Sequence, residues 1–388
     1  MQHHVRRQRH WTLAAAALVV GAVAIVVATA GPGSRPSSSR SAGGDHTTTG
    51  RHHGTASTTT TSSTSTRSAK PPAAASAGPG STTKAPESFR PDTVSTRGIY
   101  EFAGGNSGAD AHNPDLAGTT LTFEWDRLEP APGQFSWTAV NQAIAPWAAA
   151  GKRVILRVST GGQATWGAAA ADATPPWVYA QGVPAVHDDG STLPVYWNPT
   201  YLADYDAFIA AYAARYDGDP AVSLIEMGIG DGGETLPDTQ EGTTDHLAQW
   251  TAYGYSDAVW LATIEKIATT FREDFRRTPV VPLVDSSFYG PTQSEDYLAL
   301  TSWFATKGFP MQYDGLTSTT TPHNSSWRET TTIVEQRGAT STSGDTLTGD
   351  CADATGPMDS KVILIYQSDI VDPANQADLN ACATSVGS

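Results

Sequence analysis

From about Ser95 onward, short apolar segments alternate with longer amphipathic ones. The apolar segments have the length of strands, and between several of them apolar residues recur at intervals of three and four, the period of a helix. This alternation predicts βα units around a parallel sheet. The eight expected strands are 97–103, 119–125, 153–158, 222–229, 279–285, 311–318, 330–336 and 362–367.

Four amphipathic segments predict helices between these strands, whereas residues 338–360 show no clear helical pattern and 372–384 predict a short final helix. The four segments are 138–151, 198–216, 256–275 and 294–308. Eight strands in about 290 residues predict an α/β protein with a (β/α)8 TIM barrel, a fold of about 250 residues. A doubly wound open sheet is the alternative, but EFAGGNSGAD (101–110) lacks the GxGxxG spacing expected early in that fold.

The chain before the barrel has a different character. Arg6, Arg7 and Arg9 precede the apolar run Thr12–Ala30, which predicts a signal peptide or a membrane anchor within residues 1–30. Either alternative predicts a protein that is secreted or anchored to the outer face of the cell membrane. Contact with the membrane is then expected only through this segment, if it is uncleaved.

Residues 31–90 consist almost entirely of Ser, Thr, Pro, Gly and Ala, which predicts a disordered linker because they cannot bury enough apolar surface to fold. The expected domains are therefore 1–30, 31–90 and a barrel over 91–388. The first 90 residues carry ten Lys or Arg and two acids, so the other 298 carry 24 − 10 = 14 basic and 39 − 2 = 37 acidic residues. A barrel this acidic argues against nucleic acid as a partner, although solubility alone also explains the charge.

Cys351 and Cys382 are the two cysteines of the chain. Outside the cytoplasm they are expected to form a disulfide, which would close a loop of about 30 residues and contribute on the order of 3 kcal/mol. No zinc-type spacing accompanies them, and the sequence implies no metal or organic cofactor.

Acids and aromatic residues gather where the predicted strands end, and chemistry in a barrel takes place at those carboxyl ends. Carboxylates accept hydrogen bonds from sugar hydroxyls and aromatic faces pack on sugar C–H surfaces, so this mixture indicates a carbohydrate ligand. A single tryptophan of this kind is more often a core residue. The candidate substrate-binding residues are Trp125, Arg157, Trp177, Trp197, Asp231, Asp285, Asp314 and Trp327.

Two glutamates follow this pattern and suggest hydrolysis of a glycosidic bond. Glu234 follows the glycine-rich loop of IEMGIGDGGETLP (225–237), and Glu335 closes the seventh strand. Opposed strands of one barrel can bring two such carboxylates within the ~5–5.5 Å that a retaining mechanism requires. Glu226, inside the fourth strand, is expected to be a paired acid of the barrel core.

Three segments carry a resemblance to a known family. They are WDRLEPAPGQFSWTAVNQAIAPWAAAGKRVILRV (125–158), PVYWNPTYLADYDAFIAAYAARYDGDPAVSLIEMGIGDGGE (194–234) and WRETTTIVEQ (327–336). They resemble the retaining glycosidase clan of (β/α)8 barrels, nearest to bacterial beta-galactosidase-like proteins. This resemblance implies that Glu234 is the general acid/base and Glu335 the nucleophile. The clan usually has Asn before the acid/base, where this chain has Gly233.

The sequence thus predicts a glycoside hydrolase that acts on an extracellular polysaccharide or oligosaccharide through a pair of glutamates. The alternative is a non-catalytic carbohydrate-binding barrel on the cell surface, which the Gly233 departure favours. A scaffold that contacts another protein is a third hypothesis, and it predicts acids paired with arginines.

Overall fold

The computed structural model describes residues 96–161, 172–188, 191–238, 245–284, 293–317 and 331–387. The predicted segments 1–30 and 31–90 lie outside the described residues, as do Asp285 and Trp327. Within the described ranges, no helix combines the length and apolar character needed to cross a membrane.

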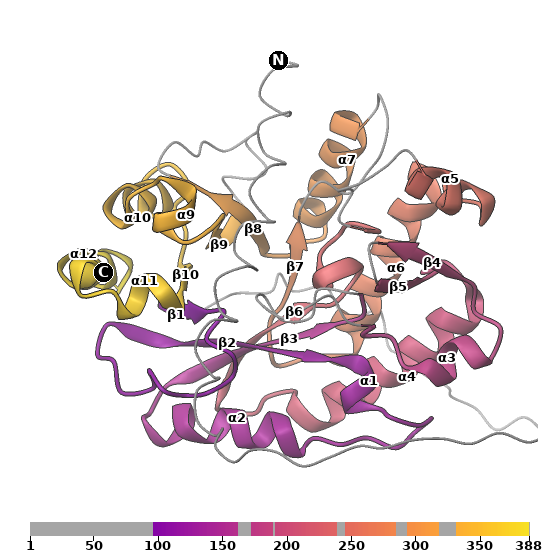
Figure 1. The fold of residues 1–388 in the computed structure, drawn as a ribbon, viewed down its shortest axis with the longest axis horizontal. Helices are drawn as coiled ribbons and strands as arrows, with labels where there is room; N and C mark the ends of the chain where they lie inside the picture. Colours follow the sequence, from indigo (N-terminus) through magenta and orange to yellow (C-terminus); the bar gives the residue numbers. More distant parts are fainter. Residues whose placement is uncertain are drawn as a thin grey trace, which may run out of the picture. The chain divides into compact units, whose positions relative to one another are not determined.

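Eight parallel strands form a closed barrel (Figure 1). Each strand lies at a predicted position, so the (β/α)8 barrel is confirmed, and the closed sheet excludes the doubly wound alternative. In the order of the barrel wall the strands are β1 (Gly98–Phe102), β2 (Leu116–Glu124), β3 (Arg153–Ser159), β6 (Val222–Met227), β7 (Val280–Val284), β8 (Met311–Leu316), β9 (Thr331–Gln336) and β10 (Val362–Tyr366).

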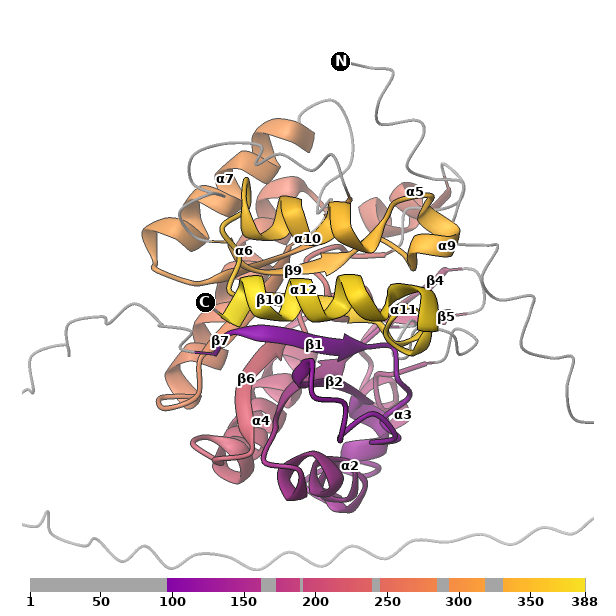
Figure 2. The ribbon, with the colours of Figure 1, turned by 90° about the vertical axis from the view of Figure 1, so that its left-hand side faces the viewer.

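The barrel closes between its first and last strands. β1 pairs with β10 in parallel from Gly98 opposite Val362 to Phe102 opposite Tyr366. The C-terminal helix α12 (Gln376–Gly387) packs against β1, and Figure 2 shows the two running beside each other. The last helix therefore covers the closing seam.

The four predicted helices are confirmed with ends that differ by a few residues. Asn198 accepts hydrogen bonds from the backbone N–H groups of Thr200 and Tyr201, and so caps the second of them. Ser256 caps the third by accepting from Val259. The helices are α2 (Thr138–Ala149), α4 (Pro199–Tyr216), α6 (Asp257–Asp274) and α7 (Gln293–Thr306).

An aromatic face attaches α4 to the rest of the fold. Tyr201, Tyr205, Phe208 and Tyr212 follow one another at helical spacing, are buried, and have adjacent ring centroids 5.8 to 5.9 Å apart. The hydroxyl of Tyr205 donates a hydrogen bond to the carbonyl oxygen of Gly228, just after β6. This bond fixes the start of the glycine-rich loop that leads to Glu234.

Some elements were not predicted. A hairpin of β4 (Ala185–Asp188) and β5 (Ser191–Pro194) precedes α4. Helices also form in 338–360, where none was expected, because burial of Leu347, Cys351 and Ala354 outweighs the weak helical propensity of that segment. The remaining elements are α1 (Trp125–Leu128), α3 (Pro176–Ala180), η3 (Asp231–Gly233), α5 (Asp245–Ala252), α9 (Thr340–Ser343), α10 (Leu347–Thr355), α11 (Gln367–Val371) and η4 (Pro373–Asn375).

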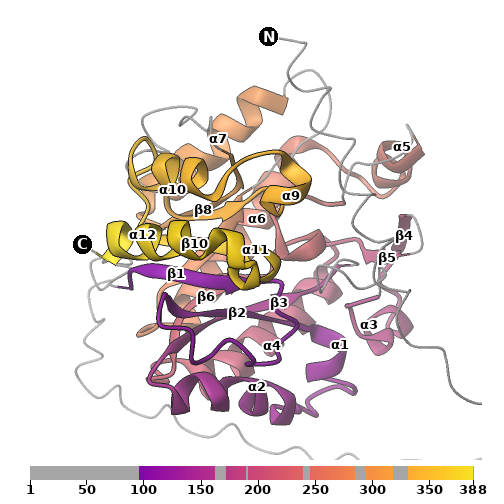
Figure 3. The same ribbon diagram turned by 60° about the vertical axis from the view of Figure 1, so that its left-hand side comes forward.

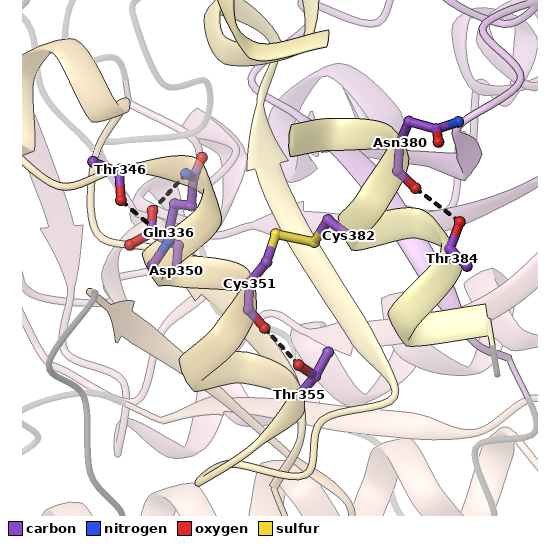
Figure 4. The surroundings of a disulfide bond; sticks show 9 residues. Gln336, Thr346, Asp350, Cys351, Thr355, Asn380, Cys382 and Thr384 are labelled. Carbon is purple, nitrogen blue, oxygen red and sulfur yellow. Dashed lines mark hydrogen bonds between the residues drawn. A yellow bond between two sulfur atoms is a disulfide. The ribbon is translucent and has the colours of Figure 1, made fainter. Parts of the chain in front are cut away.

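The predicted disulfide is present between Cys351 of α10 and Cys382 of α12, with their Cα atoms 5.6 Å apart (Figure 4). The two helices pack against each other on the same side of the barrel (Figure 3). The bond therefore ties the irregular segment after β9 to the helix that covers the closing seam.

Candidate active site

The barrel interior changes from apolar to polar toward the carboxyl ends of its strands. Side chains two positions apart on a strand share one face, so the residues that follow interior Ile155, Leu224 and Ile333 by two positions also face the interior. We call the following set the polar layer: Arg157, Glu226, Gln312, Asp314 and Glu335.

Arg157 bridges two acids of the polar layer. Its Nε donates to Glu226, which lies opposite it on the neighbouring strand, and its Nη2 lies 2.9 Å from Oε2 of Glu335. All three side chains are buried, and the guanidinium also lies over the ring of Phe102, 5.3 Å from its centroid. The expected role of Glu226 as a paired core acid is confirmed, while contact of Arg157 with a substrate stays a prediction.

Glu335 receives a second hydrogen bond, because Nε2 of Gln312 lies 2.9 Å from the same Oε2 and 3.1 Å from Oδ1 of Asp314. Burial and the nearby charge of Asp314 raise the pKa of the Glu335 carboxyl well above its ordinary value, and Arg157 opposes this shift. The ionised form of Glu335 therefore depends on Arg157.

The glycine-rich loop carries Glu234 from β6 to the rim beside β7. Gly228 approaches the Val158 carbonyl so closely that a Cβ would lie 1.9 Å from its oxygen. Gly232 and Gly233 have φ values of 63° and 89°, in the left-handed region that favours glycine. Glu234 is half-buried and forms a parallel bridge with Leu283 of β7.

Tyr366, the last residue of β10, is affected by the charges of both predicted catalytic glutamates. Burial raises the pKa of its hydroxyl, and the charges of Glu335, Asp314 and Glu234 raise it further, while Arg157 lowers it. Both glutamates therefore act electrostatically on one side chain at the carboxyl end of the barrel.

One of the predicted aromatic residues is placed differently from expectation. Trp125 was expected to contact substrate, but it is fully buried, donates its indole N–H to Glu129, and packs among the rings of Trp177 and α4. This prediction is wrong because Trp125 begins helix α1, which turns its side chain into the core. Trp177 and Trp197 are half-buried, and their N–H groups donate to the carbonyls of Glu129 and Tyr253.

The two described aspartates of the prediction lie at different depths. Asp231 is buried in the turn before Glu234, where its Oδ1 accepts a hydrogen bond from the N–H of Gly232. Burial raises the pKa of the Tyr196 hydroxyl, and the charge of Asp231 raises it further. Asp314 is half-buried and belongs to the polar layer. Contact of either residue with a substrate stays a prediction.

Sequence reasoning missed Gln312 and Tyr366. Gln312 could have been found because it precedes Asp314 by two positions on one strand and so shares its face. Tyr366 ends an otherwise apolar strand, and its position beside Glu335 follows only from the packing of β10 against β9. In the part of the chain that the structure describes, no group of three His, Cys, Asp or Glu side chains is arranged to hold a metal ion.

Part of the chain matches a known protein family. Residues 115–275 match the model of glycoside hydrolase family 42, described as beta-galactosidase. The match runs from β2 to the end of α6, so it includes Glu234 and stops before Glu335. The resemblance to beta-galactosidase-like barrel glycosidases is confirmed over this region, and no curated protein matches the chain.

Three solved structures are similar to the chain at low identity. The catalytic domain of a beta-amylase from Paenibacillus polymyxa has 13% identity and a TM-score of 0.48, covering 69% of this chain and 91% of that one. A beta-galactosidase from the psychrophilic Marinomonas ef1 has 11% identity and a TM-score of 0.46, covering 73% and 57%. A cold-adapted beta-galactosidase from Rahnella sp. R3 has 15% identity and a TM-score of 0.37, covering 58% of this chain and 40% of that one. The chain thus spans 57% and 40% of these two beta-galactosidases.

Proposed function

We propose that the protein is a retaining glycoside hydrolase in which Glu335 is the nucleophile and Glu234 is the general acid/base. The placement of Glu335 carries this proposal, because two N–H donors, on Arg157 and Gln312, hold its Oε2 at the carboxyl end of β9. Such donors favour the carboxylate and fix its orientation. The other oxygen, Oε1, is the atom that would attack.

In the first step, Oε1 of Glu335 forms a bond to the anomeric carbon while the bond to the leaving oxygen breaks. Glu234 gives its proton to that oxygen, which leaves as an alcohol. In the second step Glu234 takes a proton from water, the water oxygen bonds to the anomeric carbon, and the Glu335 carboxylate is released. Protons balance over the cycle because Glu234 ends as it began.

The family match supports a carbohydrate substrate, and we further propose that it is an oligosaccharide or polysaccharide outside the cytoplasm. The basic and apolar pattern of residues 1–30 supports export, with the barrel either released or anchored. An acidic domain suits a neutral sugar better than an anionic one, because like charges repel.

A non-catalytic carbohydrate-binding barrel is the second candidate, and Gly233 favours it. At φ 89° this position has a backbone conformation that Asn adopts only with strain, so the usual hydroxyl-holding side chain before the acid/base is absent here. Such a barrel would bind sugars without turnover.

Hydrolysis of aryl glycosides and unmodified polysaccharides tests the proposal. The parent protein is expected to turn over at least one sugar, and Glu335→Gln and Glu234→Gln are expected to lower kcat/KM by several orders of magnitude. Glu234→Gln should keep more activity on substrates with a very acidic phenol leaving group, which needs no protonation. Azide should restore turnover in the Glu234→Gln variant by attacking the glycosyl-enzyme without a base.

Glu124→Gln is the matched control, because Glu124 also ends a strand but pairs with exposed Arg127. It should keep parental activity. Sugar binding without turnover by the parent would reject hydrolysis and support the binding barrel.

A further inference from the structure

A hydrogen-bonded pair lies directly behind Glu335 on the opposite face of β9. Gln336 and Asp350 are each about 1% exposed, and Nε2 of Gln336 lies 2.8 Å from Oδ2 of Asp350 (Figure 4). Oδ1 of Asp350 has no hydrogen-bond partner in the described part of the chain. A buried carboxyl group is costly to retain, so its place behind the candidate nucleophile needs an explanation.

Gln336 lies where two strands separate. The pairing of β10 with β9 ends at Leu364 opposite Glu335. Two residues further along β10, the backbone N–H of Tyr366 donates instead to the side-chain Oε1 of Gln336, at 2.9 Å. The amide of Gln336 thus continues the connection between β9 and β10 at the level of the candidate site.

The two partners fix the orientation of this amide. The backbone N–H of Tyr366 can only donate, so Oε1 of Gln336 must face it, and the NH2 group must face an acceptor. Asp350 is that acceptor. If the amide rotated, Oε1 would meet a carboxylate and the N–H of Tyr366 would lose its partner.

The helix that carries Asp350 is itself held in place. Thr346 caps α10 by accepting the N–H of Gly349, and Cys351, the residue after Asp350, forms the disulfide with Cys382 of α12. Asp350 therefore sits on a covalently fixed helix rather than on a free loop.

We propose that Gln336 and Asp350 are positioning residues for Glu335 and Tyr366, and that the Cys351–Cys382 disulfide fixes the helix from which Asp350 acts. The pair sets the spacing of the ends of β9 and β10, and with it the position of the Glu335 carboxylate relative to Arg157 and Gln312. This inference rests on the proposed function of Glu335 as the nucleophile.

The test compares Asp350→Asn with Asp350→Leu in the full-length protein. The side-chain amide of the Asp350→Asn variant keeps an oxygen that can accept from Gln336, so its kcat should stay within about threefold of the parent. Leucine offers no acceptor, so kcat of Asp350→Leu should fall about tenfold to a hundredfold with KM nearly unchanged, since a shift of about 1 Å costs this much. Assays are run well below the unfolding midpoint of each variant.

Thr355→Ala is the control, because Thr355 lies on α10 and its hydroxyl donates within that helix, to the carbonyl of Cys351. It should leave kcat unchanged. If Asp350→Leu fails to fold, Gln336→Met removes the same hydrogen bonds without altering α10 and takes its place. A kcat for the leucine variant equal to that of the parent overturns the proposal.

A second readout does not need activity. The pH titration of the Glu335 side-chain carboxyl is followed by 13C NMR, with Glu335→Gln giving the assignment. The apparent pKa should shift in Asp350→Leu, by about one unit if contact with Arg157 changes, and stay at the parental value in Asp350→Asn and Thr355→Ala. An inactive parent that still shows this pattern would reject hydrolysis while keeping the positioning role. An unchanged pKa of Glu335 in Asp350→Leu overturns the positioning role.

Discussion

Arg157 contacts two buried carboxylates at once, and this arrangement decides how the candidate nucleophile is charged. Glu226 lies on the neighbouring strand, whereas Glu335 is 178 positions away in the sequence. Burial and the charge of Asp314 raise the pKa of Glu335, so Glu335 can act as the nucleophile only in the ionised state that Arg157 stabilises. The sequence predicted that Glu226 is a paired core acid, but both of its partner's ion pairs follow only from the structure, and the one to Glu335 requires the barrel to close.

Replacement of Arg157 should expose this dependence. In Arg157→Met two carboxyl groups remain buried without their cation, so the free energy of unfolding should fall by about 3–5 kcal/mol. Denaturant unfolding measures it, with Arg127→Met as the control. Arg127 is 74% exposed and pairs with Glu124, so its loss should cost at most about 1 kcal/mol. Equal losses in the free energy of unfolding for the two variants would contradict the dependence of the buried acids on Arg157.

Glu101 gives a prediction about pH. Burial and the neighbouring Asp110 raise its pKa from 4.5 to about 8. The folded state therefore binds this proton more tightly than the unfolded state, so its contribution to stability is complete below pH ~4.5 and is lost as the pH rises toward ~8.

Thermal unfolding between about pH 5 and pH 8.5 tests this sign. Over that range the thermal unfolding midpoint of the parent should fall by several degrees more than the midpoint of Glu101→Gln, because glutamine cannot ionise. The two midpoints should converge at the acidic end. A parent that becomes relatively more stable as the pH rises would show that the pKa of Glu101 is lowered instead.

At the scale of elements, the loop after β6 shows how glycines place an acid. Gly228 permits contact with the neighbouring strand, and Gly232 and Gly233 permit the left-handed turn that brings Glu234 beside β7. Consecutive glycines in the sequence favour such a sharp exit from the sheet. Its direction depends on Leu283 and Tyr205, which arrive from other elements.

Gly233→Asn should not restore the usual pattern of the glycosidase clan. The position has room, because a Cβ would meet its nearest neighbours at 3.6 Å, but φ is 89°. The substitution should cost more than about 1 kcal/mol and lower kcat, because the strained turn carries Glu234. Gly254→Ala is the control, since φ there is 85° with no atom within 4 Å of the added Cβ. This control variant should lose a similar free energy of unfolding and keep the kcat of the parent.

The whole molecule depends on closure of β1 against β10, two strands from opposite ends of the barrel sequence. Truncation tests this together with the predicted boundary at residue 91. A chain of residues 91–388 should unfold cooperatively at the midpoint of the full protein. Removal of the first strand, in 104–388, should abolish cooperative unfolding, because β2 and β10 would keep unpaired edges. Circular dichroism on heating measures both, and a cooperative 104–388 would contradict the closure argument.

The sequence by itself determined the eight strands, the four main helices and the disulfide partners. These follow from local periodicity and from having two cysteines, so no distant contact is needed to find them. Only the tertiary structure decided that Trp125 packs in the core, that α10 forms, and that Arg157, Gln312 and Tyr366 surround Glu335. Those outcomes depend on which faces meet when the barrel closes, and a side chain's surroundings there come from strands that are far apart in the sequence.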